Sequence, residues 1–202
     1  MGVMKLRFTL VLLLILSVIQ GQNPLVYTNL AGDTQDLPIN KTIVVEIFAT
    51  WCHNCQSQHP DLKEVYSQYN SFPLYSLSSS SSDNITDVLS YNVTYPSPWT
   101  LGIDNNQTIS NTYGVPGFPT FLVLDNGNLK ACLVGAQSQD TLTKLFDVVQ
   151  SGGSFEDYQT SCNNGQSSTY IILGVIGSML VIVYFIWSDM KKKKSQVDAQ
   201  NQ

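Results

Sequence analysis

The feature that most constrains this chain is a pair of cysteines, Cys52 and Cys55, placed directly after an apolar run. Residues 42–49 form a near-continuous apolar stretch, which predicts a central β-strand buried on both faces. Residues 53–69 carry apolar side chains at helical spacing and predict an α-helix. The first cysteine therefore lies where a strand ends and a helix begins.

A cysteine at the start of a helix is reactive, because the unpaired backbone N–H groups and the positive end of the helix dipole favour thiolate over thiol. The thiolate is the form that attacks disulfides. Cys52 is therefore the expected attacking sulfur, with its side chain exposed. Cys55 lies one turn deeper and is expected to resolve the mixed disulfide that Cys52 forms with a substrate.

A zinc site is the chemical alternative for this pair, using Cys52, Cys55 and either His53 or His59. Structural zinc usually requires a second Cys/His pair at a defined spacing, and the sequence offers none. We therefore expect no metal and no organic cofactor beyond a redox-active Cys52–Cys55 disulfide. His59, which precedes Pro60, is expected to be a surface residue of the helix.

Residues 45–55, VEIFATWCHNC, resemble the active-site segment of the thioredoxin superfamily. The glutamate of this segment, Glu46, is most similar to protein disulfide isomerase domains, while the long stretch 76–104 resembles the TlpA-like branch. Residues 113–120 are similar to the loop in which the superfamily carries a cis-proline facing the cysteines. By this resemblance Pro119 is the cis-proline.

The resemblance covers about residues 25–150 and implies the α/β thioredoxin fold, a central mixed sheet flanked by helices. The order of the expected elements, strand, helix, strand, helix, hairpin and helix, agrees with it. After the first helix the sequence predicts a strand at 72–77 and a polar loop without packing contacts at 78–82. A helix capped by Asp83 and ending near 91 and a second short helix at 107–113 are expected next. The domain would end with hairpin strands at 118–124 and 129–135, joined by a type I′ turn at Asn126-Gly127, and with a closing helix at 140–150.

The resemblance also implies how the groups around the cysteines act. Glu46 would accept a proton from Cys55 through water, since a buried carboxylate is costly without a partner or a task. The alternative is that Glu46 lies on a solvated face. His53, when protonated, would stabilise the thiolate, and Asn54 stands where protein disulfide isomerases have histidine. The alternative for His53 is an exposed residue with little effect on the sulfur.

Two further segments are expected to receive substrate. Trp51 and Phe118 would form an apolar rim around the sulfurs, and the backbone at Pro119 and Thr120 would pair with an extended peptide in strand fashion. A Trp51 that belongs to the core and a trans Pro119 are the alternatives.

The two remaining cysteines, Cys132 and Cys162, could form a structural disulfide in an oxidising compartment. A buried, free Cys132 with a separate Cys162 is equally compatible with the spacing.

The N-terminal end is apolar from residue 8 to residue 19 and follows Lys5 and Arg7. This pattern predicts a secretory signal peptide over residues 1–21, with an uncleaved anchor as the alternative. In either case the following domain, residues 22–160, is exported.

The C-terminal end contains a second apolar run, residues 170–187, without a charge. It predicts one transmembrane helix joined to the domain by the linker 161–169. Lysines at 191–194 follow, and the positive-inside rule places the tail, 188–202, in the cytoplasm. The domain would then face the endoplasmic-reticulum lumen or the cell exterior.

Charge and sequons describe the exported part further. Residues 22–169 contain four lysines and thirteen acidic residues, a net charge of −9, which argues against nucleic-acid binding. Asn-x-Thr sequons would be N-glycosylation acceptors in a compartment with that machinery. They begin at Asn40, Asn84, Asn92 and Asn106.

Together these features predict a membrane-tethered thiol-disulfide oxidoreductase or isomerase that acts outside the cytoplasm on cysteine-containing proteins. The predicted membrane helix contains no cysteine, so turnover requires a separate redox partner or a small-thiol pool. A non-catalytic client-binding module and a metallochaperone are the alternative functions.

Overall fold

The computed structural model describes residues 24–69, 73–158, Cys162 and seven positions between 181 and 191. The chain divides into two compact units, residues 1–163 and 164–202. The described residues of the second unit are helical. The predicted segment 1–21 and most of 161–202 fall outside the described residues. Within the residues that are described, no helix is both long enough and apolar enough to cross a membrane.

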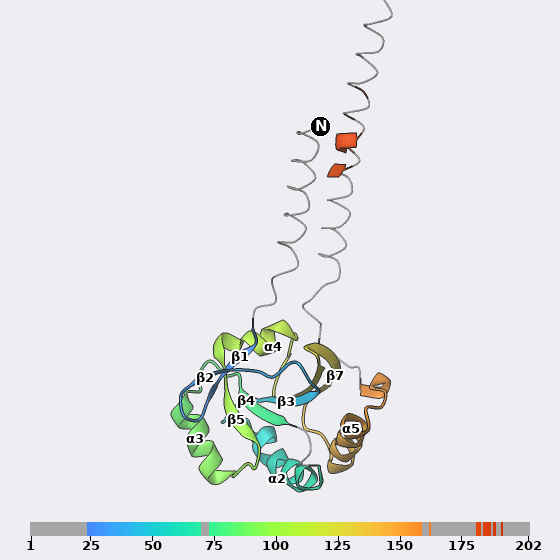
Figure 1. Cartoon of the computed structure of the whole chain (residues 1–202). Helices are drawn as coiled ribbons and strands as arrows, with labels where there is room; N and C mark the ends of the chain where they lie inside the picture. Colours follow the sequence, from blue (N-terminus) through green and yellow to red (C-terminus); the bar gives the residue numbers. More distant parts are fainter. Residues whose placement is uncertain are drawn as a thin grey trace, which may run out of the picture. The chain divides into compact units, whose positions relative to one another are not determined.

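A seven-stranded mixed sheet forms the centre of the first unit (Figure 1), in the order β2-β1-β5-β4-β3-β6-β7. All six residues of β3 (Ile43–Phe48) are buried, which confirms the central strand predicted from the apolar run. This strand pairs parallel with β4 (Leu74–Ser78) and antiparallel with β6 (Thr120–Asp125). The other strands are β1 (Val26–Asn29), β2 (Thr34–Asp36), β5 (Thr100–Asp104) and β7 (Asn128–Val134).

Helices cover both faces of the sheet (Figure 1). Alternate residues of β3 separate the two layers, because Val44 and Phe48 pack in one apolar cluster and Val45 and Ile47 in the other. The first layer contains α2 (His53–Gln68), α3 (Ile85–Thr94) and α5 (Gln139–Ser151), and the second contains α4 (Thr108–Thr112).

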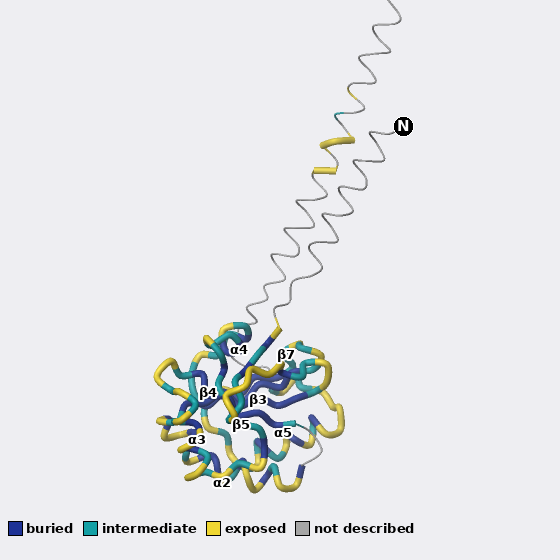
Figure 2. The backbone as a smooth tube through the Cα atoms, turned by 60° about the vertical axis from the view of Figure 1, so that its left-hand side comes forward, coloured by how far each residue is buried: buried dark blue, intermediate teal, exposed yellow. Residues whose placement is uncertain are grey.

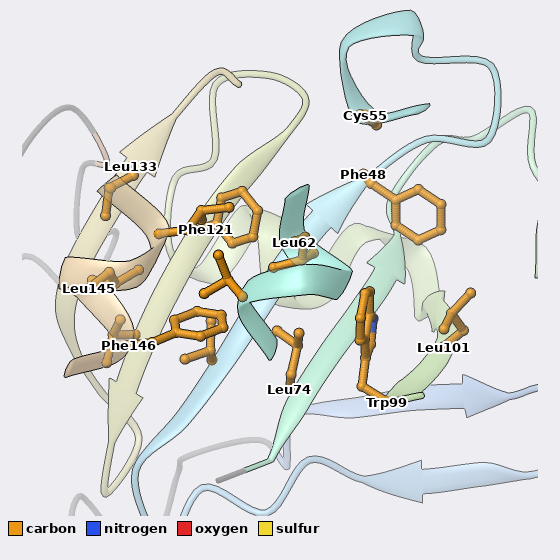
Figure 3. Packing of buried hydrophobic residues seen from close by; sticks show 14 of the residues in the cluster. Phe48, Cys55, Leu62, Leu74, Trp99, Leu101, Phe121, Leu133, Leu145 and Phe146 are labelled. Carbon is orange, nitrogen blue, oxygen red and sulfur yellow. The ribbon is translucent and has the colours of Figure 1, made fainter. Parts of the chain in front are cut away.

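The first layer is the larger core (Figure 3). Leu62 of α2, Phe121 of β6 and Phe146 of α5 are completely buried in it. Figure 2 shows these buried strands inside a shell of exposed loops and helix faces. The inward face predicted for the closing helix is confirmed, since its apolar residues Leu142, Leu145, Phe146 and Val149 are all buried.

The predicted hairpin is also confirmed. Asn126 and Gly127 have φ angles of 49° and 73°, and two consecutive positive φ angles are what a type I′ turn requires. β6 and β7 pair across this turn. The hairpin carries the Phe118–Pro119 segment at its entrance.

Three strands were not expected from the sequence. β1, β2 and β5 are short and carry polar residues, so they lack the apolar alternation that identifies a strand. The strand expected at 72–77 is observed at Leu74–Ser78, and the helix expected at 107–113 is α4, preceded by a 3-10 turn at Asn105–Gln107.

The segment between β4 and α3 differs most from expectation. Ser78 and Ser79 are buried at 0 % and 2 % exposure, so the prediction of a loop without packing contacts was wrong there. Asn84, and not Asp83, caps α3, because its side chain accepts hydrogen bonds from the backbone N–H groups of the first turn. Asp83 is directed to the active-site segment instead.

Candidate active site

Cys52 is the N-cap residue of α2, and Cys55 lies in the first turn of that helix. A disulfide joins the two residues, with their Cα atoms 5.3 Å apart. The backbone N–H of Cys55 donates to Cys52 Sγ at 3.1 Å. Such an N–H at a helix start would stabilise the thiolate once the disulfide is reduced.

The two cysteines differ in access. Cys52 keeps 7 % of its surface and Cys55 keeps none. Cys52 is therefore less open than the sequence suggested, but it is the one that a substrate sulfur can approach. Cys55 lies behind it, as expected for the resolving residue.

Glu46 lies in β3 on the face shared by Val44 and Phe48, which is the layer that contains both cysteines. The residue is 5 % exposed, so the alternative of a solvated face was wrong. Burial raises the pKa of Glu46 to about 7, and a hydrogen bond from the Ser76 hydroxyl opposes that rise. A carboxyl group with this pKa can accept or release a proton near neutrality.

The partners of Glu46 were missed in the sequence. Ser76 lies opposite Glu46 in the parallel pairing of β3 and β4 and donates to its Oε2 atom. Trp99 Nε1 in turn donates to Ser76 Oγ at 2.8 Å. The serine between Tyr75 and Leu77 of a buried strand was the available signal, because a buried hydroxyl group requires a partner.

Asp83 holds the segment that precedes the cysteines. Its carboxylate accepts hydrogen bonds from the Thr50 backbone N–H at 2.7 Å and from the Thr50 hydroxyl at 2.9 Å. It also accepts a hydrogen bond from Ser78 Oγ at 2.6 Å. Three donors from two segments therefore fix the backbone two residues before Cys52.

Trp51 is held over the surface beside the disulfide. Its indole Nε1 donates to Ser80 Oγ at 3.0 Å and to Ser82 Oγ at 3.1 Å. The residue is 62 % exposed, so the alternative of a core tryptophan was wrong. Its ring meets Phe118 edge-on, with the ring centroids 6.1 Å apart.

The loop that faces this region contains a cis peptide bond between Phe118 and Pro119, as the resemblance implied. Pro119 is buried, and its carbonyl accepts a hydrogen bond from Gly135. Thr120 is completely buried and its hydroxyl donates to Gly117. Thr120 therefore supports the loop, and substrate contact by Phe118, Pro119 and Thr120 stays a prediction.

His53 and Asn54 occupy the exposed first turn of α2. Both side chains are placed to meet solvent or a substrate next to the cysteines. Their effect on the redox potential stays a prediction.

His59 is buried at 5 % exposure, so its prediction as a surface residue was wrong. Its ring lies 5.4 Å from that of Trp99 and 5.6 Å from that of Tyr95, and its Nε2 lies 2.9 Å from Ser97 Oγ. Burial, with a smaller contribution from Lys63, lowers the pKa of His59 to about 4. The imidazole is therefore neutral at physiological pH.

Among the residues that the structure describes, no group of three or more His, Cys, Asp or Glu side chains could hold a metal ion. His59 faces an aromatic cluster, and Cys52 and Cys55 are bonded to each other.

Cys132 and Cys162 form a second disulfide, with Cα atoms 5.9 Å apart. Cys132 is 3 % exposed in β7. The structure thus shows the paired arrangement and not the two separate cysteines that the sequence left as an alternative.

The sequon asparagines differ in exposure. Asn40, Asn84 and Asn106 are exposed. Asn92 is half-buried, and its Oδ1 accepts a hydrogen bond from the Ser97 backbone N–H at 3.1 Å. Glycosylation at any of them stays a prediction.

Comparison with known proteins matches residues 40–129 to a family described as thioredoxin-like. The thiol-disulfide oxidoreductase ResA of Bacillus thuringiensis (strain Al Hakam) is 27 % identical over 121 residues, which cover 58 % of this chain and 69 % of the relative. Thioredoxin-T of Drosophila melanogaster is 31 % identical over 108 residues, 54 % of each chain.

Two solved structures share the fold at low sequence identity. A secreted Mycobacterium tuberculosis disulfide oxidoreductase, homologous to E. coli DsbE, has a TM-score of 0.54 and 21 % identity, covering 61 % of this chain and 94 % of its own. The exposed lipoprotein thioredoxin Etrx1 of Streptococcus pneumoniae has a TM-score of 0.53 and 19 % identity, covering 62 % and 98 %.

Proposed function

We propose that this chain, which contains a thioredoxin-like domain of the thioredoxin superfamily, is a thiol-disulfide oxidoreductase that acts on cysteine-containing proteins through Cys52 and Cys55. The observation that carries the proposal is the Cys52–Cys55 disulfide at the N-terminus of α2, where the Cys55 N–H donates to Cys52 Sγ at 3.1 Å. A thiolate formed at Cys52 would be stabilised at the point where it must attack.

The reaction in the reducing direction begins with the dithiol form. The Cys52 thiolate attacks one sulfur of a client disulfide, so that a mixed disulfide forms and the second client sulfur leaves as a thiolate that takes up a proton. Cys55 then loses its proton and attacks Cys52 Sγ. This step releases the first client sulfur and leaves the Cys52–Cys55 disulfide. Two electrons have passed to the client, and the reverse sequence donates the disulfide.

Glu46 is proposed as the acceptor of the Cys55 proton. It faces the layer in which Cys55 is buried, and burial raises its pKa to about 7. A carboxylate with this pKa takes up a proton and returns it to solvent without a large barrier in either direction. Cys55 has no surface of its own from which to lose the proton to bulk water.

Substrate would dock on the rim formed by Trp51 and Phe118. Trp51 is the most exposed aromatic residue next to the disulfide, and its indole is held by two serine hydroxyl groups. The backbone before Pro119 would pair with an extended client segment. His53, at the exposed helix start, would tune the potential.

The proposal includes a location. The apolar run 170–187 and the lysines at 191–194 support a single membrane anchor with the domain outside the cytoplasm. The second disulfide, Cys132–Cys162, fits an oxidising compartment. No organic cofactor or metal is needed for the exchange, and a separate redox partner or a small-thiol pool would restore the starting form.

A trapping experiment on the full chain tests the function. Cys55→Ala should accumulate a mixed disulfide with an oxidised model peptide, because the resolving thiol is missing, whereas Cys52→Ala should form none. Equilibration of the wild type with glutathione then gives the reduction potential and the preferred direction. Wild-type exchange activity in Cys52→Ala would overturn the proposal and favour a non-catalytic client-binding module.

A further inference from the structure

Glu46, Ser76 and Trp99 form a buried row of hydrogen bonds that ends at the proposed proton acceptor, Glu46. We infer that Ser76 and Trp99 are positioning residues for Glu46, which orient its carboxyl group and stabilise its charged form, so that it can accept the proton of Cys55. The inference deepens the proposed function and rests on it. Neither Ser76 nor Trp99 forms or breaks a bond in the reaction.

The direction of each hydrogen bond is fixed by chemistry. An indole N–H can only donate, so Trp99 Nε1 donates to Ser76 Oγ at 2.8 Å. Because Ser76 Oγ accepts this bond through a lone pair, its own hydroxyl hydrogen is available to donate, and that hydrogen points to Glu46 Oε2. A hydrogen bond directed at a carboxylate oxygen favours its charged form, and a donor that polarises the hydroxyl strengthens this effect.

Packing leaves these three residues little freedom. Glu46, Ser76 and Trp99 are 5 %, 3 % and 8 % exposed. Ser76 sits opposite Glu46 in the parallel strand pairing. The Trp99 ring is enclosed by His59 at 5.4 Å and Tyr66 at 5.3 Å, and Figure 3 shows it beside Leu101 in the same layer as Phe48.

Ser76, and not a basic side chain of the described residues, stabilises the charged form of Glu46. No basic side chain in the described part of the chain forms an ion pair with Glu46. The titratable groups of the same layer are Cys52, Cys55, His59, Tyr66 and Tyr69 on α2 and its two caps, Tyr91 on α3, and Tyr95 and Tyr158. The lowered pKa of His59 keeps it neutral, and the pKa of Tyr91 is raised by burial and by the charge of Glu46, so it stays protonated.

The direct test is a titration of Glu46 in the full chain, purified in detergent in the disulfide form so that Cys52 and Cys55 do not titrate. The chain has three glutamates, and the other two, Glu64 and Glu156, are exposed. Selective ¹³C labelling of the glutamate carboxyl carbons therefore gives three signals, and Glu46→Gln identifies the one from Glu46.

Ser76→Ala should move the titration midpoint of Glu46 upward by about one pH unit, because a hydrogen bond to a charged group is removed. Trp99→Phe keeps an aromatic ring and should give a smaller upward shift. Ser76→Thr retains the hydroxyl and should restore the wild-type midpoint. Ser110→Ala is the matched control, since it removes a buried serine hydroxyl that is bonded to Ser79 in the other layer and not to Glu46.

Kinetics provide the second readout. At pH 7 the step in which Cys55 attacks the mixed disulfide should slow several-fold in Ser76→Ala, and the wild-type rate should return at higher pH. A merely structural role for Ser76 would lower stability without this shift of the pH profile. Ser110→Ala should keep the wild-type profile.

The outcomes separate the inference from the proposed function. An unchanged Glu46 midpoint in folded Ser76→Ala overturns the inference, even where exchange through Cys52 is intact. If Ser76→Ala does not fold, Trp99→Phe decides in the same way. If the wild type shows no exchange, the proposed function is wrong, and the titration still reports whether Ser76 stabilises the charge on Glu46.

Discussion

Of the carboxylates that the structure describes, the domain buries two, Glu46 and Asp104, and surrounds them differently. Asp104, at the end of β5, is 2 % exposed and accepts three hydrogen bonds. They come from the backbone N–H groups of Ile109 at 2.8 Å and Ser110 at 2.9 Å and from Ser79 Oγ at 2.9 Å. These donors tie α4 to the sheet.

Glu46 is similarly buried, at 5 % exposure, but in the described part of the chain a single side-chain donor, Ser76, reaches it. Burial therefore dominates and raises the pKa of Glu46 to about 7. The two buried carboxylates differ in how many donors hold them. Three donors fix Asp104 between β5 and α4, whereas the raised pKa of Glu46 lets its carboxyl group exchange a proton near neutrality.

The largest effect is expected where the three-donor carboxylate is removed. Asp104→Ala leaves two backbone N–H groups buried without their acceptor, so the free energy of unfolding should fall by about 4 kcal/mol in a urea titration. Asp140→Ala is the control, because Asp140 forms an exposed i,i+4 pair with Lys144 and should change stability by less than about 0.5 kcal/mol. Equal effects of the two substitutions would contradict the comparison.

Glu46→Gln, unlike Asp104→Ala, should raise the free energy of unfolding at neutral and higher pH. The pKa of Glu46 is about 7 in the folded protein against 4.5 for a free side chain, so folding favours the neutral form. The contribution of Glu46 to the free energy of unfolding is therefore complete below pH 4.5 and is lost as the pH rises to about 7. The glutamine variant avoids this loss and should be more stable than the wild type by about 3 kcal/mol above pH 7.

This pH dependence has its own control in the exposed glutamate of α2, Glu64. Glu64→Gln should follow the wild-type curve of unfolding free energy against pH. A Glu46→Gln curve parallel to that of the wild type between pH 4.5 and 7 would show that folding does not neutralise the carboxyl group of Glu46.

Asp83 has as many hydrogen-bond donors as Asp104 but is less buried than either Glu46 or Asp104. It accepts three hydrogen bonds, from the Thr50 N–H, the Thr50 hydroxyl and Ser78 Oγ, but it is only half-buried. Asp83→Ala should therefore lower the free energy of unfolding by about 2 kcal/mol, less than Asp104→Ala. Exchange should also slow, since Thr50 leads directly to Trp51 and Cys52. A loss of stability with an unchanged exchange rate would limit Asp83 to a structural role.

The sequence predicted the parts of the site that are local in the chain. Cys52 and Cys55 share one helix turn, and the apolar run of β3 identified both the central strand and the unusual Glu46 within it. The contacts that define the site further are distant in sequence. Ser76 and Glu46 are separated by 30 residues and Asp83 and Thr50 by 33, and no periodicity within a single segment reports such pairs.

The wrong predictions for Ser79 and His59 have the same physical origin, a contact between segments distant in sequence. Ser79 and His59 look like surface residues because they are polar, yet other segments cover them. Asp104 and Ser110 surround the serine, and the chain at Ser97 and Trp99 folds over the histidine. Polar residues can be buried where a partner is supplied by another element, and the partner appears only when the elements are packed together.

The buried His59 gives the smallest of the expected effects, and its contribution to stability changes with pH in the direction opposite to that of Glu46. The pKa of His59 is lowered to about 4, against 6.5 for a free side chain, so folding favours its neutral form. Its contribution to stability is complete above pH 6.5 and is lost as the pH falls to about 4. In the wild type the opposing slope of Glu46 conceals this loss between pH 4.5 and 6.5.

In Glu46→Gln, therefore, the free energy of unfolding should rise with pH across this range, by about 1 kcal/mol. We expect less than for Glu46 because exposed prolines flank Ser97, so a small rearrangement of residues 96–98 would give the protonated ring access to water. Adding His59→Phe to Glu46→Gln should remove the rise, since other titrating groups are the same in both variants. A rise that persists in the double variant would assign it to a group other than His59, and the coupling of His59 ionisation to folding would be refuted.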